Sequence, residues 1–323
     1  LRSATMVLKD KLLEILETHN GEFISGAALA QRLSVSRNAV WKAIGALKQE
    51  GYKIETSRSG YRMSSFNDML SVPALKKYLS YPLDIRLLKT VDSTNNAAKL
   101  AAHEINGNGL IIAQEQTAGR GRMGRSFFSP AGCGIYMSII VHPNITLDKA
   151  VMLTAAAAVA VADAISDICG SDARIKWVND IFINGKKVCG ILSEAALSLE
   201  TGGMDYAIVG IGVNFKEPDG GYPDELKDIV GAVYTDEPAD KAAKIKLISG
   251  IVNRFLEIYY QLPDIGFIKR YRDLSMLIGK NVTVCGENEF KALVLDIDDA
   301  CRLVVDSGEK IYKLSSGEVR VRL

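Results

Sequence analysis

The sequence predicts an α+β protein built from several domains. Three changes of pattern along the chain support this. Capped helices occupy residues 1–65, strands alternate with helices as in a mixed sheet over residues 83–275, and five short strands follow over residues 276–323. The length of 323 residues fits two or three domains, and 48% apolar residues can supply their cores. We expect residues 66–82 to form a connector with a short helix.

Charge and composition exclude several classes of protein. The net charge is +1, which excludes a uniformly basic nucleic-acid-binding chain, but residues 1–65 hold ten basic and six acidic residues. The five cysteines form no CxxC pair and the three histidines are far apart, so we expect reduced thiols and no histidine-based metal site. No secretory signal is visible, and the uncharged run 150–162 is too short to span a membrane. We therefore expect a cytoplasmic protein without membrane contact.

The first 65 residues predict a winged helix-turn-helix. A helix over 7–18 is followed by a second over 26–33, for which Ser25 is the N-cap. After a short turn, Ser36 caps a third helix over 37–50. Two alternating runs around the turn Ser57-Arg58-Ser59-Gly60 then predict a β-wing.

The third helix has a polar face that suits DNA. Its buried stripe leaves Arg37, Asn38, Trp41 and Lys42 outside, with Arg37 and Asn38 at the helix N-terminus, where base edges are usually contacted. In the wing, Arg58 is placed to meet a phosphate. The alternative is a small helical domain with a solvated basic face. The capped helices, the wing and the local charge together favour DNA binding.

A polar cluster opens the first helix of the central domain. A strand over 85–91 leads into Asp92-Ser93-Thr94-Asn95, and a helix follows over 95–103. Taken alone, these four residues are best explained as an ordinary N-cap cluster.

A glycine- and arginine-rich loop follows the strand 110–114. Gly119, Gly121 and Gly124 match the dinucleotide-binding pattern, but the loop sequence Ser-Phe-Phe-Ser-Pro follows where that pattern needs a helix. Arginines alternate with the glycines, at Arg120, Arg122 and Arg125. This composition indicates a flexible loop that closes over a small phosphorylated ligand. The alternative is an exposed basic loop for nucleic acid.

The segment 175–193 predicts a hairpin with a charged pair. A strand over 175–183 turns at Asn184-Gly185 and returns over 186–193. A two-residue turn would place Phe182 opposite Lys187 and Asp180 opposite Cys189, with Asp180 and Lys187 on one face. This pair is either functional or a structural ion pair.

The remaining elements complete the pattern. We expect a strand over 134–142, an alanine-rich helix over 147–169, a strand over 206–215, a lid-like loop over 219–230, and helices over 241–261 and 268–275. The five short strands of the last segment predict an SH3-like β-barrel: 281–285, 290–297, 302–305, 310–314 and 318–321.

Five motifs in this order resemble the biotin protein ligase family. They are Asp92-Ser-Thr-Asn95, Gly119-Arg-Gly-Arg-Met-Gly-Arg125, Lys176-Trp-Val-Asn-Asp180, Lys187-Val-Cys-Gly-Ile-Leu192 and Gly210-Ile-Gly-Val-Asn214. The resemblance covers essentially the whole chain, and the winged helix in front is similar to the bifunctional class that also represses biotin genes. One departure is Phe127, which stands where an indole is common in the family, so the packing of adenine can differ.

The resemblance implies a fold, a reaction and a set of site residues. The central domain would be class II aminoacyl-tRNA-synthetase-like, and it would make biotinoyl-5′-AMP from biotin and ATP with Mg²⁺ carried by ATP. It would then transfer biotin to a lysine of a carboxylase acceptor domain. The implied biotin-binding residues are Ser93, Thr94, Asn95, Gln116, Arg120, Gly121, Arg122 and Lys187. The implied nucleotide-binding residues are Arg122, Arg125, Phe127, Asn179 and Asn214. The implied catalytic residues are Arg120, Arg122, Asp180 and Lys187.

The same resemblance implies a regulatory role. Adenylate binding would promote a homodimer that sets two winged helices on operator DNA. Two alternatives remain at this point: a transcription repressor that senses a small molecule without catalysis, and a lipoate or octanoate ligase.

Overall fold

The computed structural model describes residues 2–19, 21–49, 51–64, 70–143, 145–146, 149–197, 203–285, 289–315 and 317–321. The chain forms two compact units. One holds residues 1–78 together with 239–245, and the other holds residues 79–238 and 246–323.

The first unit contains the predicted helices and wing. The helices are α1 (Arg2–Thr18), α2 (Gly26–Leu33), α3 (Arg37–Gln49) and the short α4 (Val72–Lys76), and the wing is β1 (Ile54–Ser57) with β2 (Gly60–Met63). The predicted caps are present, because Ser25 Oγ accepts the Ala28 N–H and Ser36 Oγ accepts the Ala39 N–H, each at 3.1 Å. Helix α1 begins five residues before the predicted start, as no glycine or proline interrupts residues 2–6.

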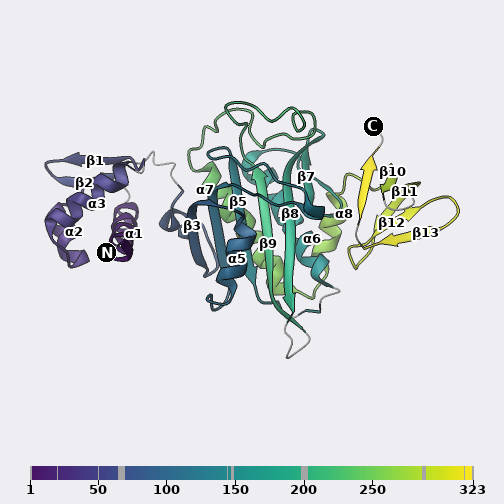
Figure 1. Cartoon of the computed structure of the whole chain (residues 1–323), viewed down its shortest axis with the longest axis horizontal. Helices are drawn as coiled ribbons and strands as arrows, with labels where there is room; N and C mark the ends of the chain where they lie inside the picture. Colours follow the sequence, from purple (N-terminus) through teal and green to yellow (C-terminus); the bar gives the residue numbers. More distant parts are fainter. Residues whose placement is uncertain are drawn as a thin grey trace. The chain divides into compact units, whose positions relative to one another are not determined.

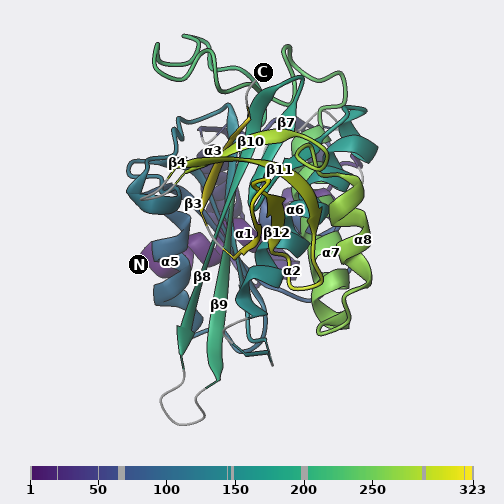
Figure 2. The ribbon, with the colours of Figure 1, turned by 90° about the vertical axis from the view of Figure 1, so that its right-hand side faces the viewer.

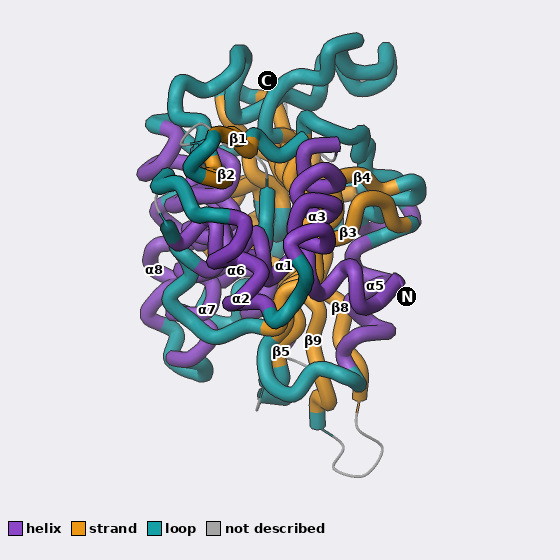
Figure 3. The backbone as a smooth tube through the Cα atoms, turned by 90° about the vertical axis from the view of Figure 1, so that its left-hand side faces the viewer, coloured by secondary structure: helices purple, strands orange, loops and turns teal. Residues whose placement is uncertain are grey.

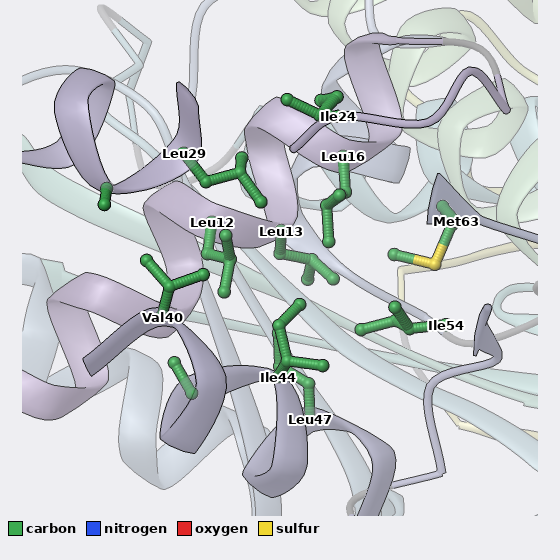
Figure 4. Packing of buried hydrophobic residues seen from close by; sticks show 12 residues of the cluster. Leu12, Leu13, Leu16, Ile24, Leu29, Val40, Ile44, Leu47, Ile54 and Met63 are labelled. Atoms are coloured by element: carbon green, nitrogen blue, oxygen red, sulfur yellow. The ribbon is translucent and has the colours of Figure 1, made fainter. Parts of the chain in front are cut away.

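An apolar core joins these helices to the wing. Leu12 and Leu16 of α1 face Val40, Ile44 and Leu47 of α3 (Figure 4). Their spacing is the helical period expected for a buried stripe. The core leaves the opposite side of α3 in solvent.

The second unit is built on a seven-stranded mixed sheet. The strand order is β3-β4-β5-β9-β8-β7-β6, and only the β3–β4 pair is parallel. The bounds are β3 (Asp84–Val91), β4 (Gly109–Gln116), β5 (Gly134–Val141), β6 (Arg174–Lys176), β7 (Asp180–Ile183), β8 (Lys186–Leu197) and β9 (Met204–Asn214). The long β8–β9 pair runs through the middle of the unit (Figure 1).

Helices cover both faces of this sheet. Helix α5 (Thr94–Ala102) lies on one side, and α6 (Ala150–Cys169), α7 (Ala243–Gln261) and α8 (Gly266–Asp273) lie on the other (Figure 2). Within the described residues, α6 alone is long and apolar enough to cross a membrane, and 67% of its most apolar window is buried. It packs as the core helix of a globular domain.

The prediction of a single strand over 175–183 is wrong. The chain instead forms a tight hairpin in which β6 and β7 pair antiparallel, with Lys176 opposite Asp180. Trp177 and Val178 both favour strands, and no glycine or proline marks the turn. The Trp177–Val178 peptide bond is cis.

The next hairpin follows the prediction at its turn but not throughout. Ile183 pairs with Lys186 and Phe182 with Lys187, as a two-residue turn at Asn184-Gly185 requires. A β-bulge after this pair places Gly190, and not Cys189, opposite Asp180. The extra residue of the bulge shifts the register, so Cys189 pairs with Ile181 and is fully buried.

The chain ends in a five-stranded antiparallel sheet. Its order is β13-β12-β11-β10-β14, with bounds β10 (Asn281–Cys285), β11 (Phe290–Ile297), β12 (Leu303–Asp306), β13 (Ile311–Leu314) and β14 (Glu318–Val321). All five predicted strands are confirmed within one residue at each end.

Candidate active site

A cavity of about 420 Å³ lies among the β4 loop, the β7–β8 hairpin, β9 and the connection that follows β9. Figure 3 shows the loops, in teal, gathered at the end of the sheet where β9 ends. Among the described residues that line the cavity, five are basic and only Asp180 is acidic; the basic ones are Arg120, Arg122, Arg125, Lys176 and Lys187. This excess of positive charge suits a ligand with several negative charges.

The N-terminus of α5 forms one polar wall. Ser93, Thr94 and Asn95 are buried, and all three line the cavity. Ser93 stands at the N-cap but makes no capping hydrogen bond with its side chain. Instead, Gln116 Oε1 accepts the Thr94 backbone N–H at 2.8 Å. Ser93 is therefore not an ordinary N-cap, and its side chain is buried at the cavity wall.

Asn95 is fixed by neighbours on two strands, β5 and β8. Its Oδ1 accepts the Ser138 hydroxyl at 2.7 Å, and its Nδ2 donates to Leu192 O at 3.1 Å and to Glu194 Oε2 at 2.9 Å. A side chain bonded on both ends cannot rotate, so this part of the cavity is preorganised.

Glu194 lies behind the cavity wall as a support for Asn95 and Arg120, and sequence reasoning missed it. It pairs with Lys99 at 2.7 Å and with Arg120 at 3.4 Å. Burial raises its pKa, but the hydrogen bonds from Lys99 and Asn95 and the charge of Arg120 outweigh burial, so its pKa lies below the ordinary value. The available signal was a lone carboxylate in the apolar strand that runs from Ile191 to Leu197.

The glycine- and arginine-rich loop is confirmed as a loop. Its only helical feature is one 3₁₀ turn, η1 (Arg122–Gly124), where Met123 has a φ of 56°. Arg122 donates to Asn179 Oδ1 and Arg120 donates to Asn96 Oδ1, each at 3.0 Å. A side chain at Gly119 would lie 2.4 Å from Phe127 O. The close approach of the two arms of the loop therefore requires glycine at position 119.

Three glycines form a floor without side chains. They are Gly190 of β8 with Gly210 and Gly212 of β9, and the ring of Phe127 rests on Gly190 and Gly212. A Cβ at Gly212 would lie 2.6 Å from that ring, and one at Gly210 would lie 2.1 Å from Asn95 Oδ1. We call Gly190, Gly210 and Gly212 the glycine floor.

The predicted charged pair is present. Lys187 Nζ lies 2.7 Å from Asp180 Oδ1, and both side chains are about one quarter exposed, at 27% and 24%. The structure brings this pair into the cavity beside Asn179 and Arg122. The hairpin that sequence reasoning singled out therefore belongs to the site.

Asn214 has a different surrounding from the other predicted residues. It lines the cavity, but its Nδ2 donates to Gly231 O at 3.0 Å. That bond fixes the connection between β9 and α7, which also supplies Tyr222 against the ring of Phe128. In this structure Asn214 shapes the wall.

The residues predicted to bind DNA lie in the first unit and are exposed. On α3 these are Arg37, Asn38, Trp41 and Lys42, and the wing carries Arg58. Trp41 is 64% exposed, which is unusual for so large an apolar side chain. A second wing arginine, Arg62, is already paired with Glu55 at 2.7 Å and stacks on Phe23.

Within the described part of the chain, no group of three or more His, Cys, Asp or Glu is placed to hold a metal ion.

Three family models match successive parts of the chain. Residues 9–62 match an HTH domain, residues 87–214 match the Biotin/lipoate A/B protein ligase family, and residues 277–322 match the Biotin protein ligase C terminal domain.

Curated relatives match over nearly the full length. The bifunctional ligase/repressor BirA of Bacillus subtilis is 36% identical over 97% of this chain and 98% of its own length. The protein of the same name from Escherichia coli is 26% identical over 97% and 96%. Among solved structures, the biotin protein ligase of Aquifex aeolicus in complex with biotin and ATP is 26% identical, with a TM-score of 0.61 over 74% of this chain and 98% of that one.

Proposed function

This chain belongs to the biotin protein ligase family, in the class that carries an N-terminal helix-turn-helix, and we propose that it is both a ligase and a repressor. As a ligase it forms biotinoyl-5′-AMP from biotin and ATP and then transfers biotin to a lysine of a carboxylase acceptor domain. The observation that carries this proposal is the strongly cationic cavity beside the Asp180–Lys187 pair.

The first step needs positive charge and alignment more than a nucleophile. The biotin carboxylate attacks the α-phosphorus of ATP and pyrophosphate leaves, so several anionic groups meet in one place. Arg120, Arg122 and Lys187 surround that place and offset the repulsion. The polar wall Ser93, Thr94, Asn95 and Gln116, with Gly121, holds biotin.

The nucleotide lies on the other side of the loop. Arg125 and Phe127 contact it from the loop, with Asn179 and Asn214 at the neighbouring wall. Mg²⁺ enters as the ion of MgATP, whose phosphates supply the oxygen ligands that this ion prefers. The single carboxylate among the described lining residues agrees with an ion carried by the substrate.

In the second step the acceptor lysine must be neutral to attack. The amine adds to the acyl carbonyl of the adenylate, AMP leaves with the bonding electrons, and the amine loses a proton. Asp180 is the carboxylate that can orient this amine or take its proton.

The repressor function uses the first unit and a dimer. The polar face of α3 and the wing contact operator DNA through Arg37, Asn38, Trp41, Lys42 and Arg58. A homodimer forms through β8, since β7 pairs with β8 only as far as Gly190 while β8 continues to Leu197. Adenylate favours the dimer by binding that state better.

The domain boundaries, the domain types and the cellular location belong to the same proposal. Residues 1–65 form the DNA-binding domain, 66–82 the connector, 83–275 the catalytic domain of class II synthetase type, and 276–323 an SH3-like domain. The protein works in the cytoplasm without membrane contact.

Pyrophosphate release tests the proposal. Full-length protein receives MgATP with biotin, with lipoate, or with no acid, and the product is identified by mass. A biotin-dependent signal with a biotinoyl-adenylate mass is expected. A lipoate-only signal would identify a lipoate ligase, and silence from folded protein would identify a non-catalytic sensor.

A further inference from the structure

The turn 177–179 is held from outside the sheet to which it belongs. Trp177 is 4% exposed, and its indole Nε1–H donates to Cys301 O at 2.9 Å. Tyr271 of α8 is fully buried, and its hydroxyl donates to Val178 O, also at 2.9 Å. Two successive residues of the turn are therefore fixed by two different elements.

These two elements are joined to each other. Arg272, the neighbour of Tyr271 on α8, donates to Ile297 O and pairs with Asp299 at 2.7 Å. The turn 298–302 that carries Cys301 is closed by Asp298, whose carboxylate accepts the N–H groups of Ala300 and Arg302, each at 3.0 Å. Helix α8, this turn and the turn 177–179 thus form a closed triangle of contacts.

The turn 177–179 and the residue that follows it line the cavity through Trp177, Asn179 and Asp180. Asn179 Oδ1 accepts a hydrogen bond from Arg122, and its Nδ2 donates one to Ile191 O at 2.8 Å. Asp180 follows directly and pairs with Lys187. A shift of this turn would move Asn179, the partner of Arg122 in the loop, and Asp180, the partner of Lys187 in the hairpin, at the same time.

From this triangle we infer that Tyr271 and Trp177 are positioning residues through which α8 and the C-terminal sheet set Asn179 and Asp180 for the reaction. The inference rests on the proposed function and deepens it, because it names two residues that fix the position of Asn179 and Asp180. The hydroxyl of Tyr271 is not among the groups that line the cavity, so it acts through Val178. A misplacement of about 1 Å at a reacting group can slow a reaction by about a hundredfold.

The test compares two Tyr→Phe variants in the full-length protein. Tyr271→Phe removes only the hydroxyl bonded to Val178 O. The control, Tyr260→Phe, also removes a bonded hydroxyl, which accepts from Asn108 at 2.8 Å on an exposed ring away from the cavity. In single-turnover adenylate formation we expect the maximal rate constant of Tyr271→Phe to fall about tenfold, with the half-saturating biotin concentration unchanged within about twofold. Equal behaviour of the two variants would overturn the inference.

A second readout needs no catalysis. The chain has two tryptophans, so Trp41→Phe leaves Trp177 as the only tryptophan, which is excited selectively over the tyrosines. In that background, Tyr271→Phe should shift Trp177 emission to the red and increase its quenching by acrylamide, while Tyr260→Phe should not. If the wild type makes no adenylate, the proposed function fails, and the fluorescence still decides whether Tyr271 fixes the turn.

A surface variant provides a separate test in case Tyr271→Phe does not fold. Asp299 is 69% exposed and contacts Arg272 from the far side of the triangle. Asp299→Asn should lower the maximal rate constant by a smaller factor, with the half-saturating biotin concentration unchanged. A rate constant equal to that of the wild type, together with unchanged Trp177 emission in the Trp41→Phe background, would contradict the triangle.

Discussion

Lys187 contacts the carboxylate of Asp180 at 2.7 Å, although the strand register places Gly190 opposite Asp180. The missing side chain at Gly190 leaves the space that the lysine crosses, and Lys187 Cε lies 3.3 Å from where a Cβ at Gly190 would stand. The cation and the carboxylate thus meet above the glycine floor and in the cavity.

Lys187→Ala should lower the rate of adenylate formation by about a hundredfold, because it removes a cation where anionic groups meet. Binding of DNA by the ligand-free protein should stay intact, since Lys187 belongs to the second compact unit. Pyrophosphate release and a DNA mobility assay on one preparation check both parts. Normal ATP turnover would refute the assignment.

Asp180→Asn should slow transfer to the acceptor lysine more than adenylate formation, because the amide keeps the shape but cannot take a proton. The two rates are measured separately, by single turnover with and without acceptor protein. Equal slowing of both steps would assign Asp180 a purely structural role.

Gly210→Ala should raise KM for biotin by about tenfold or more, because its Cβ would lie 2.1 Å from Asn95 Oδ1 and Asn95 cannot move without losing its bonds. Gly220→Ala is the control, since a Cβ there meets nothing within 4 Å. An unchanged KM in Gly210→Ala would show that Asn95 does not hold biotin.

Glu17→Gln should stabilise the protein at pH 7. Burial raises the pKa of Glu17 above its ordinary value of 4.5, against the opposing effects of the Ser71 hydroxyl and Lys77. For an acid with a raised pKa, stability is greatest while it is protonated and is lost as pH rises through the folded pKa. A rise in Tm of about 2–4 °C is expected at pH 7 and none near pH 4.

The control for this prediction is Glu14→Gln on the exposed face of the same helix. A gain in Tm that is equal for both variants, or independent of pH, would contradict the assignment to Glu17.

Removal of residues 1–65 should abolish operator binding and leave ligation, because the apolar cluster of the helices and wing is built from residues 8–63 alone. Operator binding and biotin transfer are measured on the same truncated protein. Loss of ligation from a folded protein would show that the catalytic unit depends on this segment.

Local signals predicted much of the fold. Ser25 and Ser36 cap helices because a hydroxyl before an apolar period satisfies free N–H groups, and Asn184-Gly185 forms its turn because both residues tolerate positive φ. The turn at Trp177 escaped prediction because it is held by Tyr271 and Cys301, which are distant in sequence. The bulge between the Ile181–Cys189 and Phe182–Lys187 pairs escaped for a similar reason, as register depends on the neighbouring strand β9.

The charged residues that line the site could be predicted, but the residues that hold its wall in place could not. The arginine loop and the Asp180–Lys187 pair were visible as charges beside glycines and apolar residues. Glu194 and Lys99 were not, since their significance comes from Asn95 and Arg120, which the fold brings to them.

The glycine floor has a consequence for the design of altered ligases. Because the floor has no side chains, it offers nothing to trim, and every substitution there can only make the site smaller. A pocket widened for bulkier or chemically tagged acids must therefore gain its room from the movable parts that face the floor, above all the ring of Phe127.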